Sequence, residues 1–426
     1  MARSMGLGGR LGERLNERLA GRGGELATVC LLTLIQGCTW NLCIPFLPLY
    51  ARQLGGDELF VGILNTIPAL LFIVSSIPGG VAASRRGKSL VFRLAFAGGA
   101  AAGALHAMSR HPWVLAAPQL LFGLSHAVFW PSQAAYLTEV IPERDRPAIL
   151  GVVMSLNTLG AVLGPSCGGL LAQYAGYRAV FAASGVLSAV AFGVCGRLPH
   201  RSNAGNARDA LGGAIPDSLS VVRRLLGKPV LRFSMAMTFV TFAFYALVDT
   251  FFPLFLEDLG LGPASIGMLV TARTAAMTAL RLGSGAFVNR TRASVAMPAC
   301  IVASCAAMVV ASLAGTATRP LVLAGCCAVM GAASGMVPVF SMLLIASATG
   351  VEERPVATGL DAAWSSVGTT VGSLSFGAVS KASGLATCMW AGSAAIGTAA
   401  LGAAARLGGD LDGGPAGMEG GVRREG

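Results

Sequence analysis

The chain has 426 residues, of which 54% are hydrophobic and 12% are charged, and its formal net charge at pH 7 is +11. A soluble globular domain has about twice that share of charged residues, so the composition excludes an ordinary soluble domain and indicates a helical protein with many membrane spans. The 57 glycines are spread through the apolar runs, where they allow helices to pack closely in lipid.

An amphipathic pattern comes first along the chain, and twelve apolar runs follow it. Residues 5–22 place leucines four apart between arginines, which predicts a short helix on the membrane surface. Each later run is long enough to cross a bilayer as a helix. The runs lie at roughly 27–50, 60–83, 90–109, 113–138, 148–173, 177–196, 231–256, 263–288, 294–314, 320–348, 356–380 and 385–405.

A polar segment between the sixth and seventh runs divides the helices into two groups of six. The predicted organisation is a tail at 1–26, a six-helix bundle at 27–196, a central loop at 197–230, a second six-helix bundle at 231–405 and a tail at 406–426. Within the central loop, residues 217–226 alternate apolar and basic side chains, which predicts a helix on the inner membrane surface.

The lysines and arginines predict the orientation of the chain. Of these 31 residues, 23 fall in tails and loops on the side of the N-terminus, five fall in loops on the other side, and three lie within spans. Loops rich in basic residues stay in the cytoplasm, so we expect a cell membrane protein, in the plasma or inner membrane, with both termini cytoplasmic. The positive charge then reflects topology, and it implies no nucleic-acid partner.

Two stretches of the first half recur in the second. Residues 146–164 align without gaps onto residues 354–372 at an offset of 208, and residues 48–62 match residues 253–267 at an offset of 205. Each offset spans six helices, which is an even number, so both halves insert with the same orientation. Parallel repeats of this kind are typical of transporters with a site between the two halves.

A glycine-rich stretch lies in the fifth predicted span. Gly160, Gly164 and Gly168 are four residues apart, and Pro165 and Gly169 accompany them. Small residues at this spacing let another helix approach until the backbones touch, and Pro165 removes one backbone donor and bends the helix. The stretch predicts either a dimerisation face or a joint between helices of one chain.

These motifs resemble those of the major facilitator superfamily over essentially the whole chain after residue 26. The stretch 160–169, GAVLGPSCGG, matches at every fixed position the fifth-span signature of that family's drug-exporting antiporters. Residues 80–88 resemble its signature loop, with Ser84 in place of the usual aspartate. Gln119 stands where a fourth-span signature usually has arginine, so the family's proton-linked arginine is absent.

The resemblance implies an all-α membrane protein whose twelve helices form two pseudo-symmetric six-helix bundles. It also implies that the fifth span packs against the small residues of the eleventh and so closes the extracellular side. The candidate gating residues are Gly80, Arg85, Gly87, Lys88, Glu139, Gly160, Gly164, Pro165, Gly168, Gly169, Asp361, Gly368 and Gly372.

A few ionisable groups fall within the predicted spans, where burial demands a partner or a proton. Asp249 and Arg273 lie at similar depths in the seventh and eighth spans, so they are the best candidate ion pair. The Asp249 carboxylate is either a proton carrier or part of a static structural pair. His126 in the fourth span is a third candidate for proton coupling because imidazole titrates near neutral pH, and a simple hydrogen-bonding role is the alternative.

Asp361 lies near the cytoplasmic start of the predicted eleventh span, where the helix dipole favours a carboxylate. One interpretation is a plain capping role. The other is a latch in which Asp361 contacts Arg85, because Ser84 cannot replace the family's acid. Glu139 is an alternative partner for the loop arginines.

Aromatic and amide side chains suit a large amphipathic or weakly cationic substrate. By resemblance, the candidates that line the cavity are Gln36, Trp40, Asn41, Gln119, Trp130, Asn157 and Trp364. The sequence shows no phosphate-binding loop, metal-ligand cluster or nucleophile arrangement, so we predict no metal, no cofactor and no enzymatic activity.

The sequence therefore predicts a secondary transporter that works by alternating access in the lipid bilayer. We expect it to act as a monomer that exports a small amphipathic molecule or drug in exchange for protons. An uptake carrier or facilitator of the same fold is the alternative, and a transporter-like receptor without flux is a more remote one.

Overall fold

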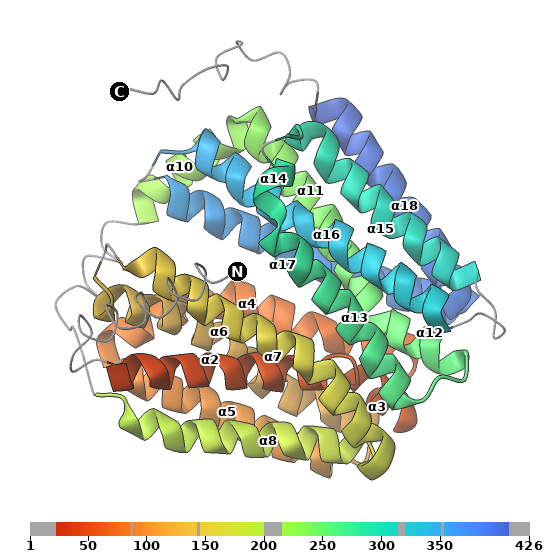
Figure 1. Cartoon of the computed structure of the whole chain (residues 1–426), viewed down its shortest axis with the longest axis horizontal. Helices are drawn as coiled ribbons and strands as arrows, with labels where there is room; N and C mark the ends of the chain where they lie inside the picture. The colour runs from red at the N-terminus through yellow and green to blue at the C-terminus, as the bar shows by residue number, and fades with distance from the viewer. Residues whose placement is uncertain are drawn as a thin grey trace, which may run out of the picture.

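The computed structural model describes residues 23–86, 88–142, 145–199, 215–288, 290–313, 320–350 and 353–408, and every regular element among them is helical. The predicted surface helix at 5–22 lies outside these residues. Among the described residues, the helices from α2 to α8 form one bundle and those from α11 to α18 form a second bundle beside it (Figure 1). The predicted fold class is confirmed.

The first bundle begins with a broken rod. It consists of α2 (Gly23–Cys43) and α3 (Leu47–Gln53), and the chain turns at Ile44–Phe46 between them. The other rods are α4 (Glu58–Arg86), α5 (Lys88–Met108), α6 (Ala116–Val140) after the 3-10 turn η1 (Pro112–Leu115), α7 (Arg146–Ala175), and α8 (Tyr177–Val194) with its 3-10 end η2 (Cys195–Arg197).

The second bundle begins in the same way. Helix α11 (Pro229–Ala246) continues through a π-helical segment, η3 (Leu247–Phe251), into α12 (Phe252–Asp258). The other rods are α13 (Pro263–Leu282) followed by the short α14 (Ser284–Val288), α15 (Ala293–Leu313), α16 (Pro320–Ala348), α17 (Arg354–Ser383) and α18 (Leu385–Leu407).

The helix predicted within the central loop is present as α10 (Ile215–Gly227). Its Leu225 is fully buried with Leu231, Met235 and Ala357, which belong to α11 and α17. The helix therefore packs against the end of the second bundle.

Within the described residues, nine helices are long and apolar enough to cross a membrane. Helices α4, α13 and α17 are not among the nine; in α4 the apolar stretch found is the shorter Glu58–Val74, and in α13 and α17 polar side chains such as Arg273, Asp361 and several threonines interrupt the apolar character. Helices α13 and α17 pack against the other bundle, α13 on α7 and α17 on α4. A helix covered by protein on two sides tolerates more polar residues than one that faces lipid.

The backbone preserves the internal repeat. Four described glycines have positive φ angles, and they form two pairs at the repeat offsets. Gly55 (φ 92°) corresponds to Gly260 (φ 82°) at an offset of 205, and Gly176 (φ 80°) corresponds to Gly384 (φ 85°) at an offset of 208. Because side chains rarely adopt this conformation, both halves require glycine at the same two turns.

The two bundles meet closely where α3 and α12 lie side by side (Figure 1). We call this the α3–α12 end, and we call the opposite end, where α10 lies, the α10 end. Ion pairs and hydrogen bonds join the bundles at the α3–α12 end. In the described state, this end of the molecule is held shut.

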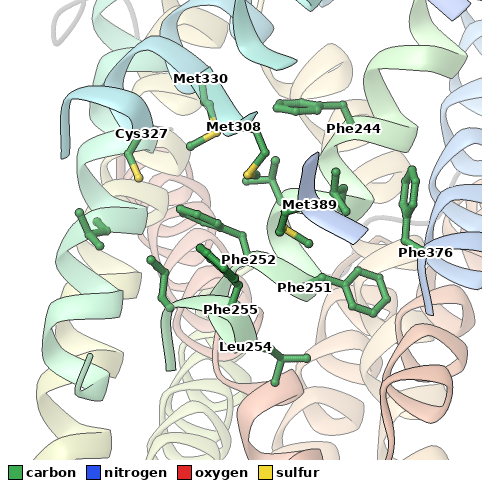
Figure 2. Close-up of a cluster of buried hydrophobic side chains, with 14 of the residues drawn as sticks. Phe244, Phe251, Phe252, Leu254, Phe255, Met308, Cys327, Met330, Phe376 and Met389 are labelled. Carbon is green, nitrogen blue, oxygen red and sulfur yellow. The ribbon is translucent and has the colours of Figure 1, made fainter. Parts of the chain in front are cut away.

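An aromatic and sulfur-rich core fills the second bundle near the break in its first rod. Figure 2 shows Phe251, Phe252 and Phe255 beside Met308 and Met389, and all five side chains are buried. Flexible methionine side chains fill the irregular space around the rings. The core fixes η3 and α12, and it thereby fixes the direction of the Asp249 side chain at the start of this segment.

Candidate substrate cavity between the bundles

A cavity of about 320 Å³ lies between the two bundles. The first bundle contributes Trp40, Phe122 and Phe181 to its wall, and the second contributes Tyr245 and Asp249. Its volume is at the lower end of the range for small-molecule sites, and its wall combines aromatic rings with a few polar groups, as such sites do. The cavity is therefore the candidate substrate site.

The predicted ion pair is present. Arg273 on α13 donates a hydrogen bond from Nη2 to Oδ1 of Asp249. Asp249 lies in the π-helical segment η3 and lines both the main cavity and a second cavity of about 180 Å³, which Arg273 also lines. π-helical turns often occur at functional sites, and here the turn places the partly exposed Asp249 carboxylate on the wall of both cavities.

His126 lies at the centre of a polar and aromatic cluster. Trp130 donates its indole N–H to Nε2 of His126 at 3.0 Å, and Trp40 stacks on the imidazole with 3.7 Å between the ring centroids. Because an indole only donates, Nε2 carries no proton, so the proton of the neutral ring lies on Nδ1. Nδ1 lies 3.2 Å from Nε2 of Gln36, and because both groups would then be donors, the Gln36 amide must be turned over so that its oxygen accepts the Nδ1 proton.

His126 is thus held by a hydrogen bond from Trp130, by the Gln36 amide and by stacking on Trp40 in the described state. These contacts agree with the hydrogen-bonding alternative, and the proton-carrier role stays a prediction.

Asp361 does not cap a helix, and the capping prediction is wrong. Helix α17 begins at Arg354, so Asp361 lies in its third turn, about 10 Å along the axis. Its Oδ1 accepts hydrogen bonds from Thr238 at 2.8 Å and from Ser341 at 3.0 Å, and Ser341 also pairs with Ser234. Asp361 therefore points into its own bundle, toward α11 and α16. The proposed partner Arg85 belongs to a stretch whose side chains lie outside the description.

The predicted cavity residues fall into two groups. Trp40 and Gln119 line the main cavity, and Trp40 and Asn41 line the second one. Gln36 and Trp130 instead hold His126, as described above. The backbone of Asn157 packs against Gly37 on α2, and Trp364 packs edge-on against Phe239. These last four residues line neither of the two cavities.

The predicted contact of the glycine stripe is wrong. A Cβ atom at Gly164 would lie 2.9 Å from the backbone nitrogen of Leu42, and one at Gly168 would lie 2.8 Å from the Leu42 oxygen. Gly160 likewise faces the backbone of α2 near Cys38. The stripe therefore joins α7 to α2 within the first bundle, and it does not meet the eleventh span.

The repeat reproduces this contact in the second bundle. Gly368 and Gly372 on α17 face Phe239 and Ala243 on α11. They are counterparts of Gly160 and Gly164, as the offset of 208 predicts, but each pair packs against the first rod of its own bundle. In each bundle, close backbone contact therefore holds the glycine-bearing helix against the first rod.

A different pair of glycine contacts joins the two bundles. Gly169 on α7 faces Gly267 on α13, with 3.1 Å between an added Cβ and the opposite Cα. On the other side of the molecule, Gly62 on α4 faces Gly377 on α17. The repeat offsets relate these two joints, because Gly62 corresponds to Gly267 and Gly169 corresponds to Gly377. Close approach across the interface therefore occurs twice, at equivalent places.

An ion cluster reinforces the joints at the α3–α12 end. Arg52 Nη1 lies 2.7 Å from the Asp258 carboxylate and 3.4 Å from that of Glu257. Glu257 is the repeat counterpart of Arg52, and it also accepts a hydrogen bond from the Tyr177 hydroxyl. The cluster ties α3 to the end of α12.

Asp57 joins the bundles and also caps a helix. Its Oδ1 accepts the backbone N–H of Phe60 at 2.8 Å, which caps α4, and its Oδ2 lies 2.7 Å from Lys381 Nζ at the end of α17. The hydrogen bond from Lys381 is the main cause that holds the pKa of Asp57 below its ordinary value, and the Phe60 N–H adds to it. The pair therefore contributes fully above about pH 4 and is lost as the pH falls through the lowered pKa.

We expect Asp57→Asn and Asp57→Ala to separate these two roles. Asparagine keeps the cap but loses the ion pair, so hydrogen exchange at the α3–α12 end should rise slightly, because an exposed pair contributes about 0.2–1 kcal/mol. Alanine also loses the cap and should lower the stability by a further ~1 kcal/mol. Equal melting temperatures for the two variants would contradict the capping role.

Several site residues escaped the sequence prediction. His106, Tyr245, Ser365, Ser366 and Thr369 all line the main cavity. His106 lies inside a predicted span, so its burial in an apolar run was the signal that could have revealed it. The hydroxyl residues gave no comparable signal, because serine and threonine are common in membrane helices.

Some predicted gating residues cannot be placed. Gly80 lies within α4, but its surroundings and the side chains of Arg85, Lys88 and Glu139 are not described, and Gly87 lies outside the described residues. Their roles stay predictions.

Comparison with known families gives a clear assignment. The family model described as Major Facilitator Superfamily matches residues 29–373 and 234–410. This chain belongs to the Major Facilitator Superfamily. Members of this superfamily are transporters rather than enzymes.

Superfamily proteins with curated names match part of the chain. The Multidrug resistance protein MdtG of Salmonella typhi is 32% identical over 157 residues, which are 36% of this chain and 38% of that protein. MdtG of Salmonella arizonae matches with the same figures. The matched stretch thus covers less than half of these relatives.

Solved superfamily structures match nearly the whole chain. The crystal structure of a point mutant of the nucleoside transporter NupG has a TM-score of 0.75 at 13% identity and covers 91% of this chain and 99% of its own. A bacterial homolog of the human lysosomal transporter Spinster, in an inward-facing and unoccupied conformation, has a TM-score of 0.73 at 15% identity, with coverages of 91% and 96%. At these identities, the likeness shows the fold.

Proposed function

We propose that this protein is a secondary active transporter that exports a small amphipathic molecule in exchange for protons. The observation that carries the proposal is the Asp249–Arg273 pair on the wall of a cavity shared by the two bundles. A carboxylate at such a place is costly unless it is paired or protonated. Opening the cavity to either side of the membrane would change its pairing and its proton affinity.

The sequence likeness supports export as the direction of transport. The fifth-span signature resembles that of drug-exporting antiporters, and the matching relatives are named for multidrug resistance. An uptake carrier of the same fold is the second candidate, because the structural neighbours include a protein named as a nucleoside transporter.

The orientation belongs to the same proposal. Among the described residues, most lysines and arginines in loops and at helix ends lie at the α10 end, which supports placing this end and both termini in the cytoplasm. The α3–α12 end is then extracellular, and the described state is closed on that side. The moving units are the bundles at 27–196 and 231–405, with the 197–230 loop between them, and the tails at 1–26 and 406–426 remain outside the membrane.

Vesicles with a defined proton gradient test the proposal. We expect inside-out proteoliposomes with an acidic lumen to accumulate ethidium, which can be followed by its fluorescence on DNA trapped in the lumen. Collapsing the gradient with nigericin should stop the accumulation. Ethidium movement that continues at the same rate without a gradient would instead support a facilitator.

A further inference from the structure

Four buried polar side chains of the cavity wall, those of His106, Gln119, Ser184 and Thr250, carry atoms without a hydrogen-bonding partner among the described residues, and His106 and Gln119 lie next to each other. His106 is only 2% exposed and Gln119 only 4% exposed, and both line the main cavity. The His106 ring lies near the Ala102 carbonyl and the Gln119 side chain, but neither ring nitrogen of His106 nor Gln119 Oε1 completes a hydrogen bond of normal geometry among the described residues. Leaving buried polar atoms unpaired is costly, so the site is built for a group that the cavity receives.

The surroundings restrict what that group can be. The His106 ring stacks on Phe181, with 5.0 Å between centroids, and it meets the edge of Phe122. No lysine or arginine lies among the described residues of this wall, and Asp249 belongs to the opposite bundle. A charged group would therefore lack a counter-ion at His106 and Gln119.

The hydrogen-bond donors and acceptors of His106 and Gln119 restrict the chemical class of the bound group further. A neutral imidazole offers one donor and one acceptor, and Gln119 Oε1 accepts a hydrogen bond. An uncharged carboxamide complements this set, because its N–H donates to Gln119 and its remaining N–H or oxygen satisfies the ring. A flat amide also fits beside the aromatic rings of Phe122 and Phe181.

We propose that His106 and Gln119 form a subsite for an uncharged amide-like group at one end of an aromatic substrate. The inference rests on the proposed transport function and adds the substrate class to it. The subsite lies wholly within the first bundle, so a substrate bound there would contact the first bundle through its amide and Asp249 or Tyr245 through its other end.

A matched pair of ligands tests the subsite. The probes are 2-naphthamide and 2-isopropylnaphthalene, which have similar shapes but differ in hydrogen bonding. Equilibrium dialysis against the protein in lipid nanodiscs, with empty nanodiscs subtracted, gives both dissociation constants. The measured quantity is their ratio, the constant of the apolar compound divided by that of the amide.

We expect that ratio to fall about 10-fold in Gln119→Leu and in His106→Phe, because each variant removes hydrogen-bonding groups of the subsite. Both substitutions keep the side-chain volume, and phenylalanine at position 106 also keeps the stack on Phe181. The affinity for the apolar compound should be retained, which shows that the cavity is intact. Thr241→Val is the matched control, because the Thr241 hydroxyl is also buried and unpaired but lies outside the cavity.

Two outcomes would overturn the subsite. One is a ratio that changes less than twofold in both variants, and the other is a wild-type protein that does not bind 2-naphthamide. Either result together with gradient-driven ethidium transport would reject the subsite and keep the transport proposal. A tenfold fall in the ratio without gradient-driven ethidium transport would keep the subsite and reject the transport proposal.

Discussion

Asp249→Asn is expected to reduce gradient-driven ethidium accumulation about 5–150-fold, the range of a typical coupling free energy. Asparagine has nearly the shape of aspartate but cannot release a proton, so the exchange cycle loses its carrier. Binding of ethidium, measured by equilibrium dialysis without a gradient, should change much less. Equal accumulation by the variant and the wild type would remove Asp249 from the coupling mechanism.

A second effect of Asp249→Asn is structural, because it leaves Arg273 without its anion. The Arg273 side chain is 15% exposed, and removing one partner of a buried pair costs roughly 3–5 kcal/mol. The loss should be smaller here, since Asp249 itself is 34% exposed toward the cavities. Thermal unfolding of the variant and the wild type in detergent measures this loss of stability.

A double variant separates coupling from stability. In Asp249→Asn/Arg273→Gln no charge remains unpaired, so the stability should return toward that of the wild type, while gradient-driven transport should stay low. Asp145→Asn is a suitable control, because Asp145 precedes α7 and makes no capping bond through its side chain. Recovery of transport in the double variant would show that the pair is only structural.

Gly267→Val is expected to stop transport by keeping the two bundles apart at the α3–α12 end. The added side chain would meet the backbone of Pro165 and the Cα of Gly169, which cannot move without the whole of α7. Hydrogen exchange in α3 and α12 should rise, because the contacts that shut this end are lost. The stability of each separate bundle should change little, since Gly267 lies between the bundles.

Two comparison variants make this prediction specific. Gly151→Val lies on the same helix as Gly169, but a Cβ there meets nothing within 4 Å, so it should transport normally. Gly164→Leu should instead lower the stability by about 1–3 kcal/mol, because it overpacks the α2–α7 contact inside the first bundle. Normal transport and exchange in Gly267→Val would show that close contact at this joint is not needed.

Much of the architecture could be predicted without coordinates. Apolar runs longer than a bilayer, the basic loops and the offsets of 205 and 208 follow from local composition and from repetition along the chain. The same offsets appear in the structure as the paired glycines with positive φ, Gly55 with Gly260 and Gly176 with Gly384. The Asp249–Arg273 pair was predictable as well, since few buried charges were available and depth alone brought these two together.

The partners of individual helix faces were not predictable in this way. Asp361 was expected at the start of a helix, but α17 begins two turns before it. The hydrogen-bonding partners of Asp361 are Thr238 and Ser341, which are ordinary residues in the sequence. The cavity role of His106 likewise depends on how α5 and α6 are rotated about their axes, which hydropathy does not report.

The glycine stretch at 160–169 shows most clearly what the sequence determines and what only the tertiary structure decides. Its spacing alone determined that α7 packs closely against other helices, because missing side chains permit backbone contact. Only the tertiary structure decided which helices those are. Successive residues point about 100° apart around a helix, so Gly168 faces α2 inside the first bundle while its neighbour Gly169 faces α13 across the interface. One residue of rotation thus separates a contact that builds a bundle from one that joins two bundles.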